Sequence, residues 1–381
     1  MPHISERELQ LPELEFISIS NKIASDKNII SLGPGEPDFN IAKPLINYAM
    51  KAIKNSNRYT DNQGSFELRE AITRKLKKEN KINTSPEEVL VTCGSQEAIF
   101  SALLATIDPT EQVIIQSPGY VGYLPAIELV NGVPVFLELK EDENFEINPD
   151  RLKKIINKRK TKVMILNSPS NPTGYVASKK ILEEIADIAV DNKIHIFSDE
   201  AYEKITYSKK HISIGSLNGM QDYVTTFQTF SKSFAMCGFR LGYAVGSKKL
   251  INSMNKVHSY ITLSAPRISQ MIGLEALKMP KKYTDAMVLE YKRRRNFIVS
   301  GLNDMGLYTK NPDGAFYAFA NIGKYKNSSK FSKMLLDKAK VAVIPGTEFG
   351  PAGEGYVRLS FATEYKLIDK ALKRIKECIN E

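Results

Sequence analysis

The stretch QTFSKSFAMCGFRLGYAVG, residues 228–246, sets one lysine, Lys232, among small and hydroxylated neighbours. The apolar, β-branched run that precedes it, VTTFQTF, predicts a strand that runs into a loop. A lysine at the end of a buried strand is partly desolvated, and its neutral amine can form a Schiff base with a carbonyl. Thr229, Ser231 and Arg240 supply two hydroxyls and a guanidinium, which suit a phosphate. A plain surface lysine in a turn is the alternative, and only other parts of the chain can decide between them.

Three further motifs accompany this stretch: NPTG at 171–174, SDEAY at 198–202 and YVRLSFA at 356–362. In this order, the four segments resemble the class I/II pyridoxal-phosphate-dependent aminotransferases of fold type I, the aspartate/aromatic aminotransferase-like family. The resemblance runs from about Leu32 to Ala362, nearly the whole chain. Four motifs in one order are very specific for the family and only weakly specific for a substrate.

Apolar strand-like runs alternate with helical patterns between the motifs, which predicts a mostly parallel sheet with crossover helices. The resemblance implies an α/β protein, with a large domain whose mostly parallel central sheet is covered by helices and a smaller α/β domain. The expected division is an N-terminal arm and part of the small domain at 1–43, a large cofactor-binding domain at 44–283 and a small C-terminal domain at 284–381. An N-terminal helix is expected over residues 14–24.

Composition is that of an ordinary globular enzyme: 381 residues, 42% hydrophobic and 25% charged. The net charge of +10 comes from basic clusters interleaved with glutamate and apolar residues, so no nucleic-acid partner is expected. No apolar run is long enough for a membrane span and no signal peptide is evident. Three cysteines without metal or disulfide spacing, and no second histidine near His195, predict a cytoplasmic protein with no metal site.

The resemblance implies pyridoxal 5'-phosphate as the cofactor, bound through a Schiff base to Lys232. The order strand, Gly94, helix start points backbone N–H groups at an anion, so Ser95 and Gln96 are predicted phosphate contacts; a simple capped helix is the alternative. In family register, the further cofactor contacts are a tyrosine stacked on the ring, an amide and a phenol at the phenolic oxygen, a carboxylate at the ring nitrogen and, at the phosphate, a tyrosine from a second subunit. These residues are Tyr120, Asn171, Tyr202, Asp199 and Tyr59, in that order.

Arg358 lies inside an alternating strand, where an arginine is costly to bury unless it is paired. The resemblance implies that it binds the substrate's α-carboxylate, together with Tyr120, Asn171 and the backbone of Gly35. An internal bridge to Glu354 or Glu364 is the alternative. The donor amino acid stays open. Gln96 stands where aspartate-preferring relatives often have lysine, whereas Arg267 could either reach a distal carboxylate across the interface or form an interface ion pair.

The predicted activity is transfer of an amino group from an L-amino acid to a 2-oxo acid by a ping-pong mechanism, in a homodimer with shared active sites. Lys232, Asp199 and Tyr202 are the predicted catalytic residues, with Lys232 as the base. A carbon–sulfur β-lyase or a related lyase or synthase on the same scaffold would share these residues, so motifs alone separate the two poorly. A regulator would need a DNA-binding domain, and only about thirty residues precede the first motif.

Overall fold

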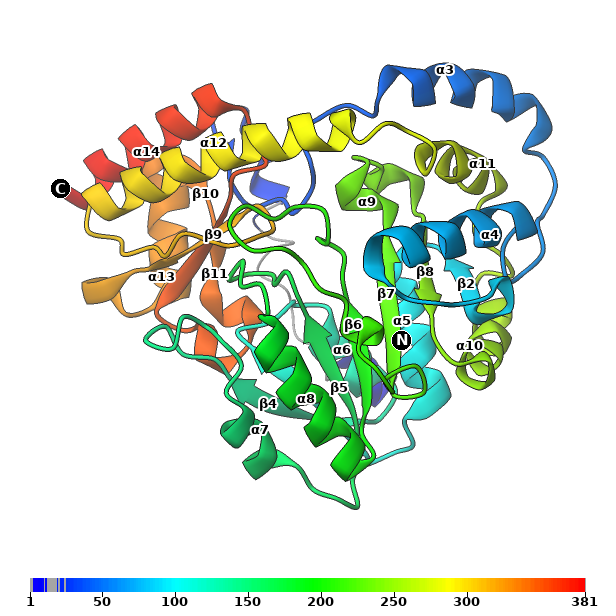
Figure 1. The fold of residues 1–381 in the computed structure, drawn as a ribbon. Coiled ribbons are helices and arrows are strands. Elements are labelled where there is room, and N and C mark those ends of the chain that lie inside the picture. Colours follow the sequence, from blue (N-terminus) through cyan, green and yellow to red (C-terminus); the bar gives the residue numbers. More distant parts are fainter. Residues whose placement is uncertain (1–2, 10, 12–18, 20, 24, 381) are drawn as a thin grey trace.

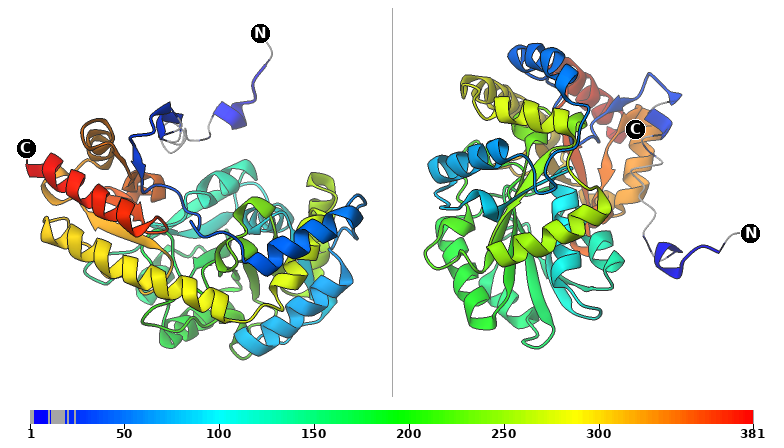
Figure 2. Two further views of the ribbon diagram at one scale, coloured as in Figure 1. Left: turned by 90° about the horizontal axis from the view of Figure 1, so that it is seen from above. Right: turned by 90° about the vertical axis from the view of Figure 1, so that its right-hand side faces the viewer.

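The computed structural model describes residues 3–9, 11, 19, 21–23 and 25–380 of the chain, and Figure 1 shows its arrangement. Most of the helix expected over residues 14–24 therefore lies outside the described residues. Within them, a large sheet with covering helices lies beside a smaller group of strands and helices, as Figure 2 also shows from two other sides. The predicted α/β fold class is confirmed.

The large sheet has seven strands in the order β2-β8-β7-β6-β5-β3-β4. Only β8 runs antiparallel to its neighbours, β2 and β7, whereas the pairs from β7 across to β4 are parallel. The strands are β2 (Val89–Thr92), β3 (Gln112–Ser117), β4 (Val133–Glu138), β5 (Thr161–Asn167), β6 (His195–Asp199), β7 (Val224–Thr229) and β8 (Gly242–Val245). The strands expected within this region are all present.

Both faces of this sheet are buried because its central strands are apolar at nearly every position. Successive side chains point to opposite faces, so Ile114 and Met164 join one core cluster while Val113 and Val163 join another. Helices cover both faces, as is usual for parallel sheets. They are α3 (Lys43–Ala52), α4 (Phe66–Lys75), α5 (Ser95–Thr106), α6 (Tyr123–Leu129), α7 (Pro149–Ile155), α8 (Lys179–Asn192), α10 (Lys248–Ile261) and α11 (Arg267–Ala276).

The smaller group of elements is built on a three-stranded antiparallel sheet in the order β11-β12-β9. Its strands are β9 (Tyr317–Asn321), β11 (Ile344–Pro345) and β12 (Tyr356–Ser360). The N-terminal β1 (Ile30–Ser31) pairs in parallel with β10 (Val341–Ala342) beside it. The helices are α12 (Lys282–Asp304), α13 (Ser328–Met334) and α14 (Tyr365–Asn380). The domain boundaries at 43 and 283 stay a prediction.

Two expected segments differ in detail from the structure. The strand expected from Lys340 is broken at Val343, because β10 pairs with β1 whereas β11 pairs with β12 in the other sheet. The loop expected after β7 is instead a four-residue helix, α9 (Phe230–Ser233), capped by the side chain of Thr229. This cap fixes the direction in which Lys232 leaves the strand.

Four parallel strands end at the same edge of the large sheet, at Ser117, Asn167, Asp199 and Thr229. In open α/β sheets, ligands collect outside the carboxyl ends of the strands. The short sheet of β9, β11 and β12 contributes Tyr317 and Arg358 to the same region. The fold therefore directs the polar ends of both sheets into one space.

Candidate active site

A cavity of about 440 Å³ lies at the carboxyl edge of the large sheet and contains every predicted site residue except Tyr59. The predicted residues that line it are Gly35, Ser95, Gln96, Tyr120, Asn171, Asp199, Tyr202, Thr229, Ser231, Lys232, Arg240 and Arg358. Ile99, Asn167, Tyr317, Ile344 and Phe349 complete much of the wall. Residues more than 320 positions apart in the chain thus meet in a single concave site.

Lys232 extends from α9 toward the N-terminal segment. Its Nζ donates to the backbone carbonyl of Gly35 at 2.5 Å and lies 5.9 Å from the centre of the Tyr202 ring. The side chain is half-buried. A single amine is therefore held by a backbone oxygen and aromatic faces, with no carboxylate recorded in a salt bridge with it among the described residues. This leaves the amine available for a carbonyl-bearing ligand.

Asp199, at the end of β6, is 5% exposed. Its Oδ2 accepts from the Tyr123 hydroxyl at 2.6 Å and its Oδ1 from the backbone N–H of Ala201 at 3.1 Å. Burial raises the pKa of Asp199, while these two hydrogen bonds act in the opposite direction. A buried carboxylate of this kind needs a cationic or N–H partner, and a protonated ring nitrogen would supply one.

The start of α5 forms a cradle with the loop after β7. A Cβ added at Gly94, whose φ is +93°, would stand 2.5 Å from Nη2 of Arg240. Arg240 donates to the backbone carbonyl of Cys237 at 2.9 Å. The Thr229 hydroxyl donates to the Ser231 hydroxyl at 2.9 Å. A helix N-terminus, two hydroxyls and a guanidinium together suit a phosphate group.

Tyr120 and Asn171 both line the cavity, and each contacts another predicted site residue. The Tyr120 hydroxyl donates to Oε1 of Gln96 at 3.3 Å, and burial raises the pKa of Tyr120 to about 12. Asn171 accepts from Nη1 of Arg358 at 3.0 Å through its Oδ1. Gln96 therefore contacts the tyrosine that is expected to stack on a cofactor ring.

Arg358 is 5% exposed, and no salt bridge to it is recorded among the described residues. Its guanidinium donates to Asn171 and to the carbonyl of Gly33, and its Cζ lies 4.4 Å from the centre of the Tyr317 ring. The alternative partner Glu354 accepts instead from the backbone N–H groups of Ser328 and Gly355. A buried arginine with only neutral partners is suited to receive an anionic ligand.

Tyr59 is the one predicted site residue outside this cavity. It is 78% exposed, in the loop before α4. Arg267, at the start of α11, donates from Nη1 to the carbonyl of Tyr59 at 3.5 Å and does not line the cavity either. Both residues therefore lie outside this chain's own cavity.

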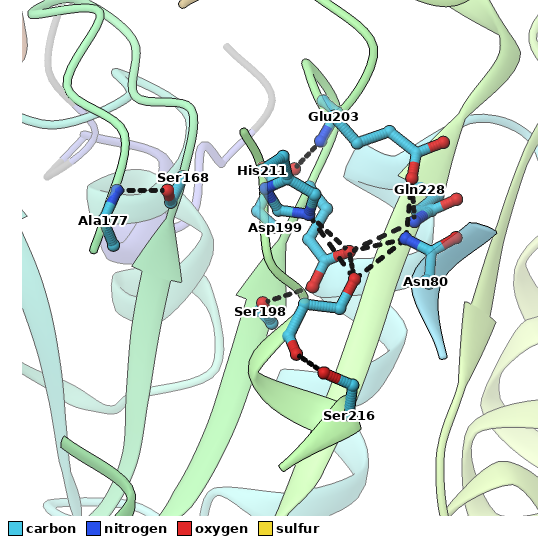
Figure 3. A network of polar contacts seen from close by, with 12 residues as sticks. Asn80, Ser168, Ala177, Ser198, Asp199, Glu203, His211, Ser216 and Gln228 are labelled. Atoms are coloured by element: carbon cyan, nitrogen blue, oxygen red, sulfur yellow. Dashed lines mark hydrogen bonds and ion pairs between the residues drawn. The ribbon is translucent and has the colours of Figure 1, made fainter. Parts of the chain in front are cut away.

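A buried polar network, not predicted from the sequence, lies behind Asp199. Figure 3 shows how Asn80, Glu203, His211 and Gln228 converge there. Asn80 Nδ2 donates to Glu203 at 2.7 Å, and Gln228 Nε2 to the same carboxylate at 2.9 Å. His211, Glu203 and the neighbouring Glu200 place ligand atoms within 4.8 Å of one another, a grouping that the expectation of no metal site overlooked.

The ammonium of Lys75, from the last turn of α4, enters this network at Glu203, and Nε2 of His211 lies 3.1 Å from Oε2 of Glu200. The ammonium donates to Glu203, to Oδ1 of Asn80 at 2.9 Å and to Oε1 of Gln228 at 2.5 Å. Glu203 and Lys75 are nearly inaccessible, at 9% and 10% side-chain exposure. The lysine therefore balances one of the two buried carboxylates.

Tyr123 and Tyr317 are the site residues that sequence reasoning missed. Tyr123 lies three residues after Tyr120, and Tyr317 belongs to the segment GAFYAFANI, 314–322, whose composition indicates only a β-rich stretch. The Tyr317 hydroxyl lies 2.6 Å from that of Tyr202. One signal in the sequence could have indicated Tyr317 as a site residue. It is a tyrosine in an otherwise apolar segment that follows Gly-Ala-Phe, and a buried hydroxyl requires a hydrogen-bond partner.

Comparison with known proteins agrees with this geometry. The sequence model of the family "Aminotransferase class I and II" matches residues 27–375. The aspartate aminotransferase of Pyrococcus abyssi is 43% identical over 94% of this chain and 93% of its own length. The chain belongs to the class I and II aminotransferases.

Two other members of the class I and II aminotransferases widen the comparison. Aromatic-amino-acid aminotransferase 2 of Thermococcus litoralis is 41% identical over 93% of this chain and 92% of its own. The solved structure of the Thermus thermophilus aspartate aminotransferase with maleate superposes with a TM-score of 0.95 at 34% identity, covering 99% and 100% of the two chains. The predicted family is thus confirmed over nearly the full length.

As a class I and II aminotransferase, the chain moves an amino group from an amino acid to a 2-oxo acid. The β-lyase alternative is not favoured, because the relatives described above are aminotransferases by name. None of the helices in the described part of the chain combines the length and apolar character needed to cross a bilayer.

Proposed function

We propose that this aminotransferase binds pyridoxal 5'-phosphate through Lys232 and uses Arg358 to receive the substrate's α-carboxylate. The observation that carries the proposal is the meeting of Lys232, Asp199 and the Gly94–Arg240 cradle in one cavity of about 440 Å³. An amine, a carboxylate and an anion cradle are the three groups that an aldehyde, a pyridine nitrogen and a phosphate require.

The donor set fits this cofactor group by group. The start of α5 with Ser95, Gln96 and Arg240 would hold the phosphate, and the buried Asp199 would pair with the ring nitrogen. Asn171 and Tyr202 would contact the phenolic oxygen, with Tyr120 against the ring. When bound, the cofactor supplies an electron sink for the charge that develops at the substrate's α-carbon.

The protein's own groups would then act in a fixed order. Arg358, supported by Asn171 and the backbone of Gly35, orients the carboxylate and so presents the α-carbon to the cavity. Nζ of Lys232 takes the proton from the α-carbon as a general base. Asp199, whose charged form is favoured by the hydrogen bonds from Tyr123 and Ala201, would stabilise positive charge on the ring nitrogen. A 2-oxo acid reverses these steps, which gives ping-pong kinetics.

The test is a covalent trapping experiment. The purified chain and Lys232→Ala are incubated with the cofactor and reduced with borohydride, and the modified peptide is identified by mass spectrometry. The expected adduct is on Lys232, and it is absent in the variant, which also loses transamination but unfolds like the wild type. Lys210→Ala, at an exposed lysine, is the matched control and should keep both adduct and activity. An adduct on another lysine would refute the role of Lys232.

We further propose a homodimer in which Tyr59 completes the cavity of the second copy. Tyr59 and Tyr260 are 78% and 86% exposed. Met50, Ile53 and Phe66 add exposed apolar surface on and near α3 and α4. These helices lie beside α10 and α11 on one side of the molecule (Figure 1), and Asn62 donates to Ser259 of α10 at 2.8 Å. Exposed apolar residues gathered in this way favour contact with another chain.

Sedimentation and mixing experiments test the homodimer. A dimer is expected in solution, and Tyr59→Phe should weaken cofactor affinity without changing the oligomeric state. Two variants that are inactive for different reasons, Tyr59→Ala and Lys232→Ala, should regain activity when their subunits are exchanged. A monomer with full activity would overturn the shared site. We also propose a cytoplasmic location, because no disulfide is recorded among the described residues.

A further inference from the structure

Tyr317 joins the two sheets at the centre of the cavity. It stands at the start of β9 in the small sheet and is 1% exposed. Its hydroxyl lies 2.6 Å from that of Tyr202, which follows β6 of the large sheet, and the two rings meet edge to face with centroids 5.7 Å apart. A hydrogen bond this short between buried phenols connects the arginine-bearing strands with the strands that carry Asp199 and Lys232.

The direction of this hydrogen bond follows from the proton count. A phenol has one O–H donor and accepts through its oxygen. If Tyr202 gives its only proton to the phenolic oxygen of a cofactor, it can meet Tyr317 only as an acceptor. Burial raises the pKa of Tyr202 well above its ordinary value, and the neighbouring Tyr317 raises it further. This hydroxyl therefore keeps its proton. Tyr317 must then be the donor of the pair.

We propose that Tyr317 is a positioning residue, whose hydroxyl donates to Tyr202 and thereby strengthens the Tyr202 O–H as a donor to the cofactor's phenolic oxygen. This inference rests on the proposed binding of pyridoxal phosphate at Lys232. Hydrogen bonds in a chain polarise one another, most strongly where water is excluded. A stronger donor at the phenolic oxygen stabilises its negative charge without the help of a proton on the neighbouring lysine-linked nitrogen. That nitrogen therefore loses its proton at a lower pH.

The Tyr317 ring has its own role, which is separate from that of the hydroxyl. Cζ of Arg358 lies 4.4 Å from the ring centre, which is cation–π distance. A Cβ added at Gly35 would stand 2.5 Å from the Tyr317 hydroxyl, so the glycine leaves room for that oxygen. The ring therefore supports the carboxylate-binding arginine while the hydroxyl serves Tyr202. Replacing tyrosine by phenylalanine removes only the function of the hydroxyl.

The charged and titratable groups that face this pair come from four other elements. They are Arg358 on β12, Tyr120 after β3, Asp199 on β6 and Lys232 on α9. All four stay in place in a Tyr317→Phe variant, because no backbone atom and no charge is altered. A change in proton affinity at the lysine-linked nitrogen can then be attributed to the missing hydroxyl.

The test is a spectroscopic pH titration of the cofactor-loaded enzyme, in which the absorbance reports the proton on the lysine-linked nitrogen. Tyr202→Phe should raise the midpoint, and Tyr317→Phe should raise it in the same direction by about half a pH unit. The double variant should match Tyr202→Phe alone, because Tyr317 acts only through Tyr202. KM for the 2-oxo acid should stay within about twofold in Tyr317→Phe, because the ring beneath Arg358 is retained.

Tyr207→Phe is the matched control, because it removes another buried hydroxyl, one that donates to the carbonyl of Ala315 at 2.5 Å. Its midpoint should equal that of the wild type. An unchanged midpoint in Tyr317→Phe, or equal and additive shifts in the double variant, would overturn the role of Tyr317. If the wild-type chain forms no absorbing species with the cofactor, the proposed function itself fails, which is a distinguishable result.

Discussion

The hydroxyl of Tyr123 donates to Oδ2 of Asp199 at 2.6 Å, from a helix start to the end of a strand 76 residues later. Asp199 must be ionised to pair with a protonated ring nitrogen. Burial raises its pKa, and the Tyr123 bond holds the carboxylate form against that effect. Tyr123 therefore lowers the pH below which Asp199 would lose its charge.

We predict that Tyr123→Phe moves the acid limb of kcat/KM to higher pH by up to about one unit. Without the donated hydrogen bond, the pKa of Asp199 rises further, so activity is lost at a higher pH as the solution is acidified. Activity near pH 8 should change much less. The pH profile of kcat/KM measures the effect, and Tyr175→Phe, whose hydroxyl contacts Glu146, is the control. A uniform loss at all pH values would instead indicate damage to the ring-binding geometry.

The sequence predicted Asp199 and Lys232 because each follows an apolar run typical of a strand and stands in a motif that resembles the aminotransferase family. It did not predict Tyr123 or Lys75 as partners, because their contacts depend on how separate strands and helices are placed. Lys75 meets Glu203 from 128 positions away, and no local period marks either residue. The division of β10 and β11 between two sheets was missed for the same reason, since strand pairing is a long-range property.

Gly94→Ala should weaken cofactor binding by about tenfold or more, because the new Cβ displaces the guanidinium of Arg240 from the cradle. A left-handed φ of +93° adds backbone strain to the collision. Gly219→Ala separates the two effects, because Gly219 has a φ of +80° and nothing within 4 Å of its added Cβ. Both variants should lose similar stability on thermal unfolding. Only Gly94→Ala should show the increase in Kd for pyridoxal phosphate. An equal increase in both variants would exclude a role of the Gly94–Arg240 cradle in binding the cofactor.

Arg358→Gln should lower kcat/KM for an amino acid by roughly 30- to 150-fold, corresponding to about 2–3 kcal/mol for charge-assisted hydrogen bonds. The loss should fall mainly on KM, because the arginine grips the carboxylate before and during the reaction. A primary amine without a carboxylate is the internal control: its slow reaction should be nearly equal in both proteins. If the variant loses activity toward both substrates equally, Arg358 supports the shape of the cavity and does not bind the carboxylate.

The ion pair of Lys75 and Glu203 predicts that folding stability changes with pH in opposite directions in the wild type and in a Lys75→Met variant. Burial would raise the pKa of Glu203, but Lys75, together with Lys204 and His211, lowers that pKa to about 2. Burial also lowers the pKa of Lys75, yet the lysine is protonated in acid in any case, so the pair titrates through Glu203. The folded-state pKa lies below the unfolded value of 4.5. The stability from this pair is therefore complete above about pH 5 and is lost as the pH falls toward 2.

Lys75→Met should cost about 3–5 kcal/mol at pH 7, because it leaves Glu203 buried beside Glu200 without its hydrogen-bonded cation. The pKa of Glu203 then rises above its unfolded value, so the variant should gain stability relative to wild type as the pH falls from 7 to 5. Urea unfolding at several pH values measures both curves. Lys75→Met combined with Glu203→Gln removes the unpaired charge and should recover much of the loss. Parallel stability curves for wild type and the single variant would contradict an ion pair at this position.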